Sequence, residues 1–421
     1  MKKKLLRYAI AFPLLIVGYL LFMLLACLMP DKPVQRNITR SLPTFMHQGD
    51  YPYAIFEKKG CKMDNFSDAL ILNMAFNISR DSLKTSLFLN PYHFTDIYMN
   101  VNLESVVRQS ESQTRYYPRY WHGSSFLMRF LLLFGNYEHL RQLFYAFSMV
   151  LLLILASLIY REAGPPYMVG LFSGFILLHG FVTQMSIQFF PVLAITLIAA
   201  IAICSKWKDF SSVCMTLFVT GSFTAFFDLL TTPLLTLGLP LLLYFVLHRN
   251  NEQTWVRTFG ETAELSLTWF VGYAATWAAK WGISTLMTGQ NVFLDAAGNA
   301  MFRSQHVDGY TRWDALAVNL QQLNFPLILV FVVAAALLAL LFFNKRNVKT
   351  ALFCLITATS PYIWYFAIAN HSQEHFWFTY RAQMIAISGI FLFFICLTDW
   401  QKIAALELPL RKPRTKSHTG N

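Results

Sequence analysis

Long apolar runs, separated by short polar segments, dominate the pattern of this 421-residue chain. A helix rises about 1.5 Å per residue and needs about 20 apolar residues to cross the hydrocarbon core of a bilayer. On that criterion we predict ten membrane-spanning helices, at residues 8–29, 142–160, 166–184, 189–204, 212–227, 231–247, 264–287, 325–343, 350–368 and 382–398. The predicted fold is an all-α polytopic membrane protein. Tight boundaries at 184–189 and 227–231 leave a re-entrant pair open as an alternative.

The amino-acid composition supports the same class. Hydrophobic residues make up 56% of the chain and charged residues only 13%, whereas a soluble domain has roughly 25% charged residues. Together with a mean hydropathy of +0.44, this excludes an ordinary soluble enzyme. The formal charge of +12 would suggest nucleic acid in a soluble protein, but no nucleic-acid motif is present and we expect no nucleic-acid partner.

Lysine and arginine gather at one set of helix ends, and the opposite short loops carry essentially none. Because basic short loops stay in the cytoplasm, we predict a multi-pass protein with both termini cytoplasmic. Residues 1–29 form a basic N-terminus and an uncleaved first helix, residues 142–398 the helix bundle, and residues 399–421 a basic tail. Two exoplasmic segments remain, residues 30–141 with interfacial helices and residues 288–323. The basic positions are Lys2, Lys3, Lys4, Arg7, Arg161, Lys206, Lys208, Arg249, Arg257, Lys345, Arg346, Lys349, Lys402, Arg411, Lys412, Arg414 and Lys416.

Three charged residues lie at or near the outer ends of predicted spans. They are Asp228 after the fifth span, Lys280 in the outer half of the seventh, and Arg381 at the start of the tenth. Charged groups are costly in hydrocarbon, and those that are present usually mark a site. All three fall on the predicted exoplasmic side, which is where we expect the functional site.

The densest polar cluster is the predicted external segment from Asn370 to Arg381. It contains His371, Glu374, His375 and Trp377. A short loop needs none of these titratable groups for solubility, although an aromatic interface belt would explain the tryptophan. The two histidines are spaced to face one metal ion but lack the HExxH order of zinc proteases. We therefore predict no metal site. No cofactor is indicated, and the sequence leaves a requirement for a divalent metal open.

Carboxylates in the first external segment are the candidates for a general base. Asp50, Asp64 and Asp68 lie next to apolar and aromatic residues, and partial desolvation raises a carboxylate pKa toward the operating range. A structural role is the alternative, because Asp64 is also placed to cap a helix that begins near Asn65. Side chains that could contact a sugar or its acceptor follow in the same segment, namely Tyr117, Trp121 and His122.

The whole-chain layout resembles the GT-C superfamily of membrane glycosyltransferases. The shared features are a cytoplasmic N-terminus, one span, a long exoplasmic segment with acidic residues and amphipathic helices, and then a bundle of many helices. The chain lacks a paired Asp-x-Asp or Asp-Glu early in that segment and a large C-terminal soluble domain, so the base and the acceptor class stay open.

The resemblance implies transfer of a sugar from a polyprenyl phosphate or diphosphate donor to an acceptor hydroxyl on the exoplasmic face of a bacterial plasma membrane. The acceptor would be a glycan, a lipid or a protein. The implied base is Asp64, with Asp50 and Asp68 as alternates. Cations near the outer leaflet would hold the donor phosphate, at Arg381, Lys280, His371 and His375. Substrate contacts would come from Asp228, Tyr117, Trp121, His122, Glu374 and Trp377.

Other functions share part of this pattern. A transporter or flippase of lipid-linked saccharides would also need many spans and a basic, aromatic lumen, but transporters place their sites near the bilayer midplane within repeated halves. This sequence shows neither an internal repeat nor charge at the midplane. A polysaccharide polymerase and a non-catalytic membrane scaffold remain as further alternatives.

The predicted topology can be measured directly. We expect a reporter fused after Lys208 or Lys345 to be cytoplasmic, and a cysteine at Asp96 to react with an impermeant reagent added outside, because the basic loops fix this orientation. Protection of position 96 from external reagent would place the candidate base on the cytoplasmic side and contradict the functional interpretation.

Overall fold

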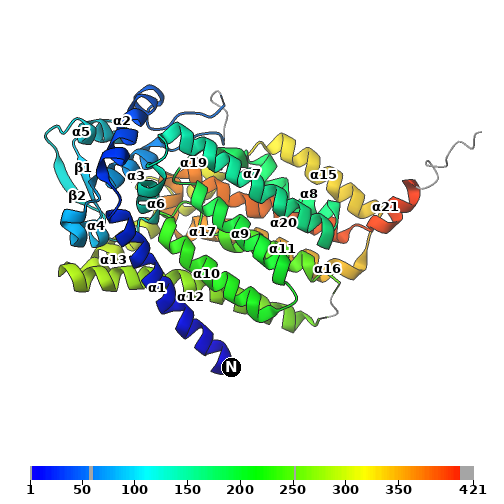
Figure 1. Ribbon diagram of the computed structural model, residues 1–421. Helices are drawn as coiled ribbons and strands as arrows, with labels where there is room; N and C mark the ends of the chain where they lie inside the picture. Colours follow the sequence, from blue (N-terminus) through cyan, green and yellow to red (C-terminus); the bar gives the residue numbers. More distant parts are fainter. Residues whose placement is uncertain (1, 56–59, 251–252, 408–421) are drawn as a thin grey trace, which may run out of the picture.

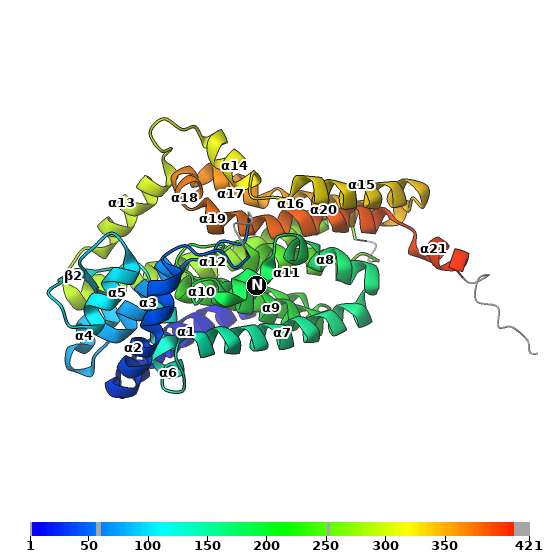
Figure 2. The same ribbon diagram turned by 90° about the horizontal axis from the view of Figure 1, so that it is seen from above.

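The computed structural model describes residues 2–55, 60–250 and 253–407, and the side chains from Leu5 onward. Helices make up most of this part of the chain, and most of them run side by side as one elongated bundle (Figures 1 and 2). The predicted basic tail lies outside the described residues from position 408 onward. The structure therefore confirms a mostly helical chain built around apolar helices.

A layer of short elements covers one end of the bundle, between α1 (Lys2–Cys27) and α7 (Tyr137–Glu162) (Figure 1). We call this part, residues 28–136, the loop layer. Its two strands pair antiparallel, with Pro91 opposite Tyr116. The all-α prediction missed this small sheet, because four residues are too short for a recognisable alternation. The elements are α2 (Asp31–Gln48), α3 (Asn65–Asn77), η1 (Arg80–Ser82), α4 (Leu83–Phe88), β1 (Pro91–Phe94), α5 (Met99–Val107), β2 (Gln113–Tyr116) and α6 (Gly123–Leu131).

The rest of the described chain supplies the bundle and the short helices that complete its loop-layer end. The elements are α8 (Pro165–Leu177), η2 (Gly180–Met185), α9 (Phe190–Lys206), α10 (Phe210–Phe227), α11 (Leu235–Leu247), α12 (Trp255–Thr288), α13 (Val292–Ser304), α14 (Arg312–Leu320), α15 (Phe325–Leu341), η3 (Lys345–Asn347), α16 (Val348–Ala358), α17 (Ser360–Ala367), α18 (Ala369–Glu374), α19 (Phe376–Thr379), η4 (Tyr380–Ala382), α20 (Gln383–Leu397) and α21 (Trp400–Glu407). The largest apolar core forms among α7 to α12, α16 and α20.

Five helical stretches among the described residues are long and apolar enough to cross a membrane. A sixth is possible if α14 and α15, which meet at an angle of 80°, count as one span. Apolar helices α8, α9 and α11 are shorter, at 13, 17 and 13 residues. The structure thus supports a membrane-embedded helical protein, and the predicted count of ten spans is not confirmed. The five stretches are Leu5–Cys27, Tyr137–Glu162, Phe210–Phe227, Lys345–Ala367 and Phe376–Leu397.

The helices α10 and α12 pack with their backbones in contact. A Cβ atom added at Gly221 would lie 2.1 Å from the carbonyl oxygen of Trp269, and one added at Gly272 would lie 2.1 Å from that of Phe218. Small residues permit such close approach and so increase van der Waals contact between the two helices. In lipid this contact matters, because apolar side chains gain little by leaving equally apolar lipid tails. The pair therefore forms a closely packed wall of the bundle.

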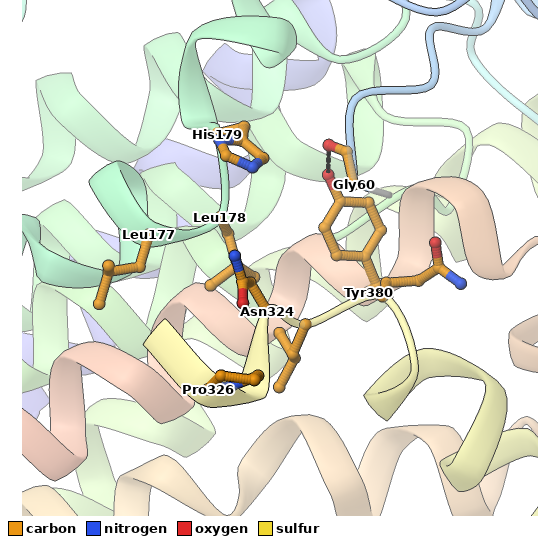
Figure 3. A pocket seen from close by; sticks show the side chains of 9 residues that line it. Gly60, Leu177, Leu178, His179, Asn324, Pro326 and Tyr380 are labelled. Atoms are coloured by element: carbon orange, nitrogen blue, oxygen red, sulfur yellow. Dashed lines mark hydrogen bonds between the residues drawn. The ribbon is translucent and has the colours of Figure 1, made fainter. Parts of the chain in front are cut away.

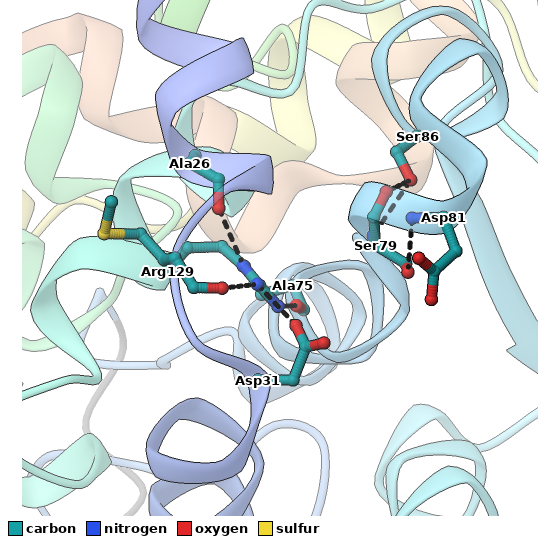
Figure 4. A network of polar contacts seen from close by, with 8 residues as sticks. Ala26, Asp31, Ala75, Ser79, Asp81, Ser86 and Arg129 are labelled. Atoms are coloured by element: carbon teal, nitrogen blue, oxygen red, sulfur yellow. Dashed lines mark hydrogen bonds and ion pairs between the residues drawn. The ribbon is translucent and has the colours of Figure 1, made fainter.

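Arg129 joins the loop layer to the end of α1 (Figure 4). Its side chain is fully buried and donates hydrogen bonds to the carbonyl oxygens of Ala26, Met29 and Ala75, at 3.1, 2.8 and 3.3 Å. It also pairs with the Asp31 carboxylate at 2.7 Å. A buried charge is stable only when its donors are satisfied, and here the acceptors are carbonyl oxygens near the ends of α1 and α3 and in the turn after α1.

We expect Arg129→Met to destabilise the protein by about 3 kcal/mol or more, because it strands a carboxylate and several buried carbonyls. The matched control is Arg108→Met. Arg108 pairs with Glu104 on the surface and is 68% exposed, so its loss should cost at most about 1 kcal/mol. Thermal unfolding of the detergent-solubilised protein, followed by tryptophan fluorescence, measures both. Equal shifts in Tm would contradict a structural role for Arg129.

Candidate functional site

Three short helices, α18, α19 and η4, connect α17 to α20 at the loop-layer end. We call this stretch, residues 369–382, the connecting segment. It carries five residues that the sequence singled out, namely His371, Glu374, His375, Trp377 and Arg381. It packs against α13 and α14. Sequence reasoning expected an external loop here, and the structure folds it into short turns that bury several of its polar side chains.

Arg381 is buried, at 1% exposure. It donates hydrogen bonds to the carbonyl oxygens of Lys62 at 2.8 Å and Trp377 at 3.3 Å. Its guanidinium carbon lies 4.1 Å from the centre of the Phe189 ring. Among the described residues, no carboxylate lies within ion-pair distance of Arg381. Its charge is therefore balanced by carbonyl dipoles, a ring face and more distant charges.

Asp64 supplies the nearby negative charge. It is buried and caps α3, accepting hydrogen bonds from the amide and the hydroxyl of Ser67, both at 2.9 Å. Burial raises the pKa of this carboxyl to about 7, and the charge of Asp68 adds to the rise, while the donors of Ser67 and the charge of Arg381 oppose it. Asp64 therefore caps the helix, and the same side chain is the candidate proton acceptor. Asp64 can exchange a proton near neutral pH.

An aromatic group with one lysine adjoins Asp64 and Arg381. The ring centres of Tyr51 and Trp377 are 5.0 Å apart, and Tyr51 stacks on Phe66 at 5.9 Å. The Lys62 ammonium lies 5.2 Å from the Tyr51 ring centre and 5.6 Å from that of Trp377. Sequence reasoning missed Lys62. Its position two residues before Asp64 was the available signal, because alternate residues of an extended stretch share a face.

The two alternate carboxylates hold backbone in place. Asp50 accepts hydrogen bonds from the amides of Met99 and Asn100 at 3.2 and 3.1 Å, and so anchors the start of α5. Asp68 is buried and accepts from four donors between 2.5 and 3.0 Å, which are the hydroxyls of Tyr137 and Ser186 and the amides of Ile187 and Gln188. These bonds give both carboxylates structural partners, and Asp64 is the candidate base that the geometry favours.

Lys280 belongs to a separate group on the α4 side of the loop layer. Its ammonium donates to the carbonyl oxygen of Leu87 at 3.1 Å and to the side-chain oxygen of Asn90 at 2.9 Å. Trp121 is buried, and its indole donates to the carbonyl oxygen of Thr276 at 2.8 Å. The structure therefore does not join Lys280 to Arg381, and it places the Trp121 ring within the protein rather than on a surface open to a sugar.

His122 and Tyr117 lie beside that group. The His122 ring donates from Nε2 to the Tyr117 carbonyl oxygen at 2.9 Å, and the two ring centres are 4.9 Å apart. Burial lowers the pKa of His122 to about 3, and the charge of Lys280 contributes. The imidazole is therefore neutral at pH 7. The aromatic side chain of Tyr120 continues this group to Trp277, with ring centres 4.8 Å apart.

Asp228 sits in the turn that ends α10. It accepts hydrogen bonds from the amide of Thr231 at 2.9 Å and from its hydroxyl. Burial raises the pKa of Asp228 to about 6, against the donors of Thr231. The same turn meets the connecting segment, because His371 donates from Nε2 to the Leu230 carbonyl oxygen at 2.7 Å. Asp228 and His371 are thus brought together through a backbone contact.

Two cavities border the connecting segment. One, of about 250 Å³, lies at the break between α14 and α15, beside Tyr380, whose hydroxyl bonds to the Gly60 carbonyl oxygen (Figure 3). His179, Asn324 and Pro326 also line it. The second, of about 530 Å³, lies between the end of α13 and α18 and is lined by Phe302, Arg303, Gln305, His306, Val307, Asp308, Asn370, Glu374 and His375.

Buried polar atoms without a hydrogen-bond partner concentrate in the connecting segment and its neighbour Gln383. Of the 17 such side-chain atoms in the described part of the chain, eight belong to residues 370–383. Native proteins leave few buried polar atoms unpaired, and a cluster of them calls for an explanation. Two of these residues, Asn370 and His375, line the larger cavity. The atoms are on Asn370, His371, Ser372, Gln373, His375, Trp377, Arg381 and Gln383.

The cap geometry separates Asp64 from Asp68 in a stability measurement. We expect Asp64→Asn not to lower Tm at pH 7, because asparagine caps a helix about as well as aspartate and carries no charge to bury. Asp68→Asn places an amide among four donors and should cost about 1–3 kcal/mol. Measuring Tm as a function of pH also tests the direction in which the charge of Asp64 changes stability. Because folding raises the pKa of Asp64, its contribution to stability is greatest below about pH 4 and is lost toward pH 7. Asp64→Asn should remove that loss, and an unchanged pH profile would contradict it.

Comparison of this chain with protein-family models, with curated proteins and with solved structures finds no match. What the chain does must therefore be argued from its own residues. Four observations are available for that argument: a proton-exchanging carboxyl at Asp64, a buried cation without a close carboxylate at Arg381, an aromatic group beside both, and two cavities along the connecting segment.

Proposed function

We propose that this protein is a membrane glycosyltransferase that moves a sugar from a polyprenyl phosphate or diphosphate donor to an acceptor hydroxyl at the exoplasmic face. One observation carries the proposal. Asp64, a buried carboxyl that titrates near neutral pH, lies in the electrostatic field of Arg381 at the start of an apolar helix. The two residues are more than 300 positions apart in the chain, so packing of distant segments puts the carboxyl within the electrostatic influence of the guanidinium.

The chemistry assigns one role to each member of the pair. The bond between the anomeric carbon and the phosphate oxygen breaks, and its electrons stay on the phosphate. A fixed cation stabilises that growing charge, and Arg381 and Lys62 are the cations at this place. The acceptor oxygen forms the new bond to the anomeric carbon while Asp64 takes its proton. A single in-line displacement inverts the anomeric centre, by analogy with inverting glycoside chemistry.

Surrounding features support binding of a lipid-linked sugar. The rings of Tyr51 and Trp377 offer faces on which a sugar can stack beside the reacting pair. The cavity at the break between α14 and α15 adjoins Tyr380, the neighbour of Arg381. Its lining includes Leu177, Leu178 and Leu323, so it can admit the first isoprene units of the donor beside Tyr380.

Donor binding tests the role of Arg381. We expect Arg381→Gln to weaken binding of undecaprenyl phosphate by about tenfold or more, because an ion pair with a phosphate in a poorly solvated site is lost. Arg381→Lys should recover only part of the affinity, since a lysine lacks the forked geometry that suits phosphate. Arg80→Gln is the matched control, because Arg80 is exposed in the loop layer. Native mass spectrometry of the purified protein gives the affinities, and full binding by Arg381→Gln would refute the assignment.

Turnover tests the role of Asp64. We expect Asp64→Asn to bind undecaprenyl phosphate normally and to slow sugar transfer by about 10²–10⁴-fold, the usual effect of losing a general base. Wild-type activity should rise with pH through about 7, because the carboxyl must be ionised to accept a proton. Release of polyprenyl phosphate from labelled donors measures both effects. An active Asp64→Asn protein would move the assignment to Asp50 or Asp228.

A further inference from the structure

The cavity of about 530 Å³ between α13 and α18 is separate from the groups that would act on the donor. Its volume falls within the roughly 300–1,000 Å³ typical of small-molecule sites. Seven of its nine lining residues are polar, which does not suit a lipid tail. The helices α13 and α18, which contribute to its lining, lie toward the loop-layer end of the molecule (Figure 2).

Hydrogen bonds to backbone hold the walls of this cavity together. The amide of Asn370 donates to the Gln305 carbonyl oxygen at 2.8 Å, which ties the start of α18 to the end of α13. Arg312 reaches back from α14 and donates to the carbonyl oxygens of Ser304 at 2.8 Å and Phe366 at 2.5 Å. These bonds join four helices, α13, α14, α17 and α18, and so fix the walls of the cavity.

The charges of the lining do not favour a polyanion as the ligand. Arg303 carries one positive charge, while Asp308 and Glu374 carry two negative ones. His375 adds none at pH 7, because burial lowers its pKa to about 3, and Arg303 contributes to that shift. A phosphate or diphosphate would meet a net negative wall here. A ligand that both donates and accepts hydrogen bonds meets suitable partners on every side.

Two side chains of the lining with buried, unpaired polar atoms point to such a ligand. Asn370, at 5% exposure, lines the cavity, and its side-chain oxygen has no hydrogen-bond partner among the described residues. His375 lines it too, and its Nδ1 is likewise unpaired. Leaving such atoms unpaired costs about 1–3 kcal/mol each. A ligand hydroxyl that bonds to them would recover that cost.

We infer that this cavity binds a saccharide, and that this saccharide is the acceptor of the transfer proposed above, on which this part of the inference rests. Sugar hydroxyls donate to Asp308 and Glu374 and accept from Arg303, as the lining requires. Phe302, whose side chain is 54% exposed at the rim, offers a ring for the apolar face of a sugar.

The cavity and the reacting pair share the connecting segment. The His375 ring, in the cavity wall, lies 5.3 Å from the ring of Trp377, and Trp377 lies 5.0 Å from Tyr51 beside Asp64. A continuous row of rings thus runs from the cavity toward the carboxyl. An acceptor chain held in the cavity can extend one sugar along this row to present a hydroxyl to Asp64.

Saturation-transfer NMR on the purified full chain tests the inference, with methyl glucoside, galactoside and mannoside and their disaccharides as probes. We expect at least one of these probes to bind the wild type, and the double variant Arg303→Gln/Glu374→Gln to weaken that binding by about tenfold or more, because hydrogen bonds to charged groups are lost. Asn370→Ala, which removes the buried amide, should weaken it as well. Arg80→Gln is the control and should bind as the wild type does.

The two proposals fail in different ways. Cavity variants should keep wild-type affinity for undecaprenyl phosphate, and Arg381→Gln should keep wild-type affinity for the saccharide. Tryptophan fluorescence and Tm establish that each variant is folded. The saccharide site is overturned if no probe binds the folded wild type, if the double variant and Asn370→Ala both bind normally, or if only a basic peptide competes for the cavity. If Arg381→Gln binds undecaprenyl phosphate as tightly as the wild type while the saccharide still binds the cavity, the transferase proposal alone is overturned.

Discussion

The buried carboxylate of Asp68 is the contact on which the arrangement of the loop layer against the bundle depends. Four donors from α7 and from the chain entering α9 converge on it. Tyr137, one of these donors, also accepts a hydrogen bond from Arg141 at 2.7 Å, and Arg141 bonds to Asn65 at 2.7 Å. A charge so enclosed is tolerated only with complete hydrogen bonding. The first turn of α3, and with it Asp64, is therefore fixed relative to the helices behind it.

The fixed position of α3 affects the pKa of Asp64, which lies one turn away from Asp68. Asp64 cannot move toward solvent to relieve its desolvation, and the negative charge of Asp68 stays close to it, so its proton affinity rises. Arg381 opposes that rise from the other side, held by the Lys62 carbonyl. Structural rigidity at Asp68 thus sets the chemical character of Asp64, which is a usual relation between a functional group and the residues that support it.

The sequence allowed the helical class and the apolar helices to be predicted, because both depend on local composition. It also allowed Asp64 to be recognised as a cap, since capping is a local rule. Which loop carboxylate meets Arg381 could not be derived, because that depends on how segments distant in the chain pack. The same reason explains why Trp121 was expected at a surface and is buried against α12, and why Arg303 was missed. Its significance comes only from the cavity that it shares with α18.

The attachment of α1 through Arg129 has a consequence for how the protein is assembled. During synthesis α1 emerges from the ribosome long before α6, so the carbonyls of its last turn must wait for about a hundred further residues before their guanidinium partner exists. Chains generally acquire structure from the N-terminus as they are made. The contacts that hold the end of the first helix to the loop layer through Arg129 can therefore form only after α6 has been made.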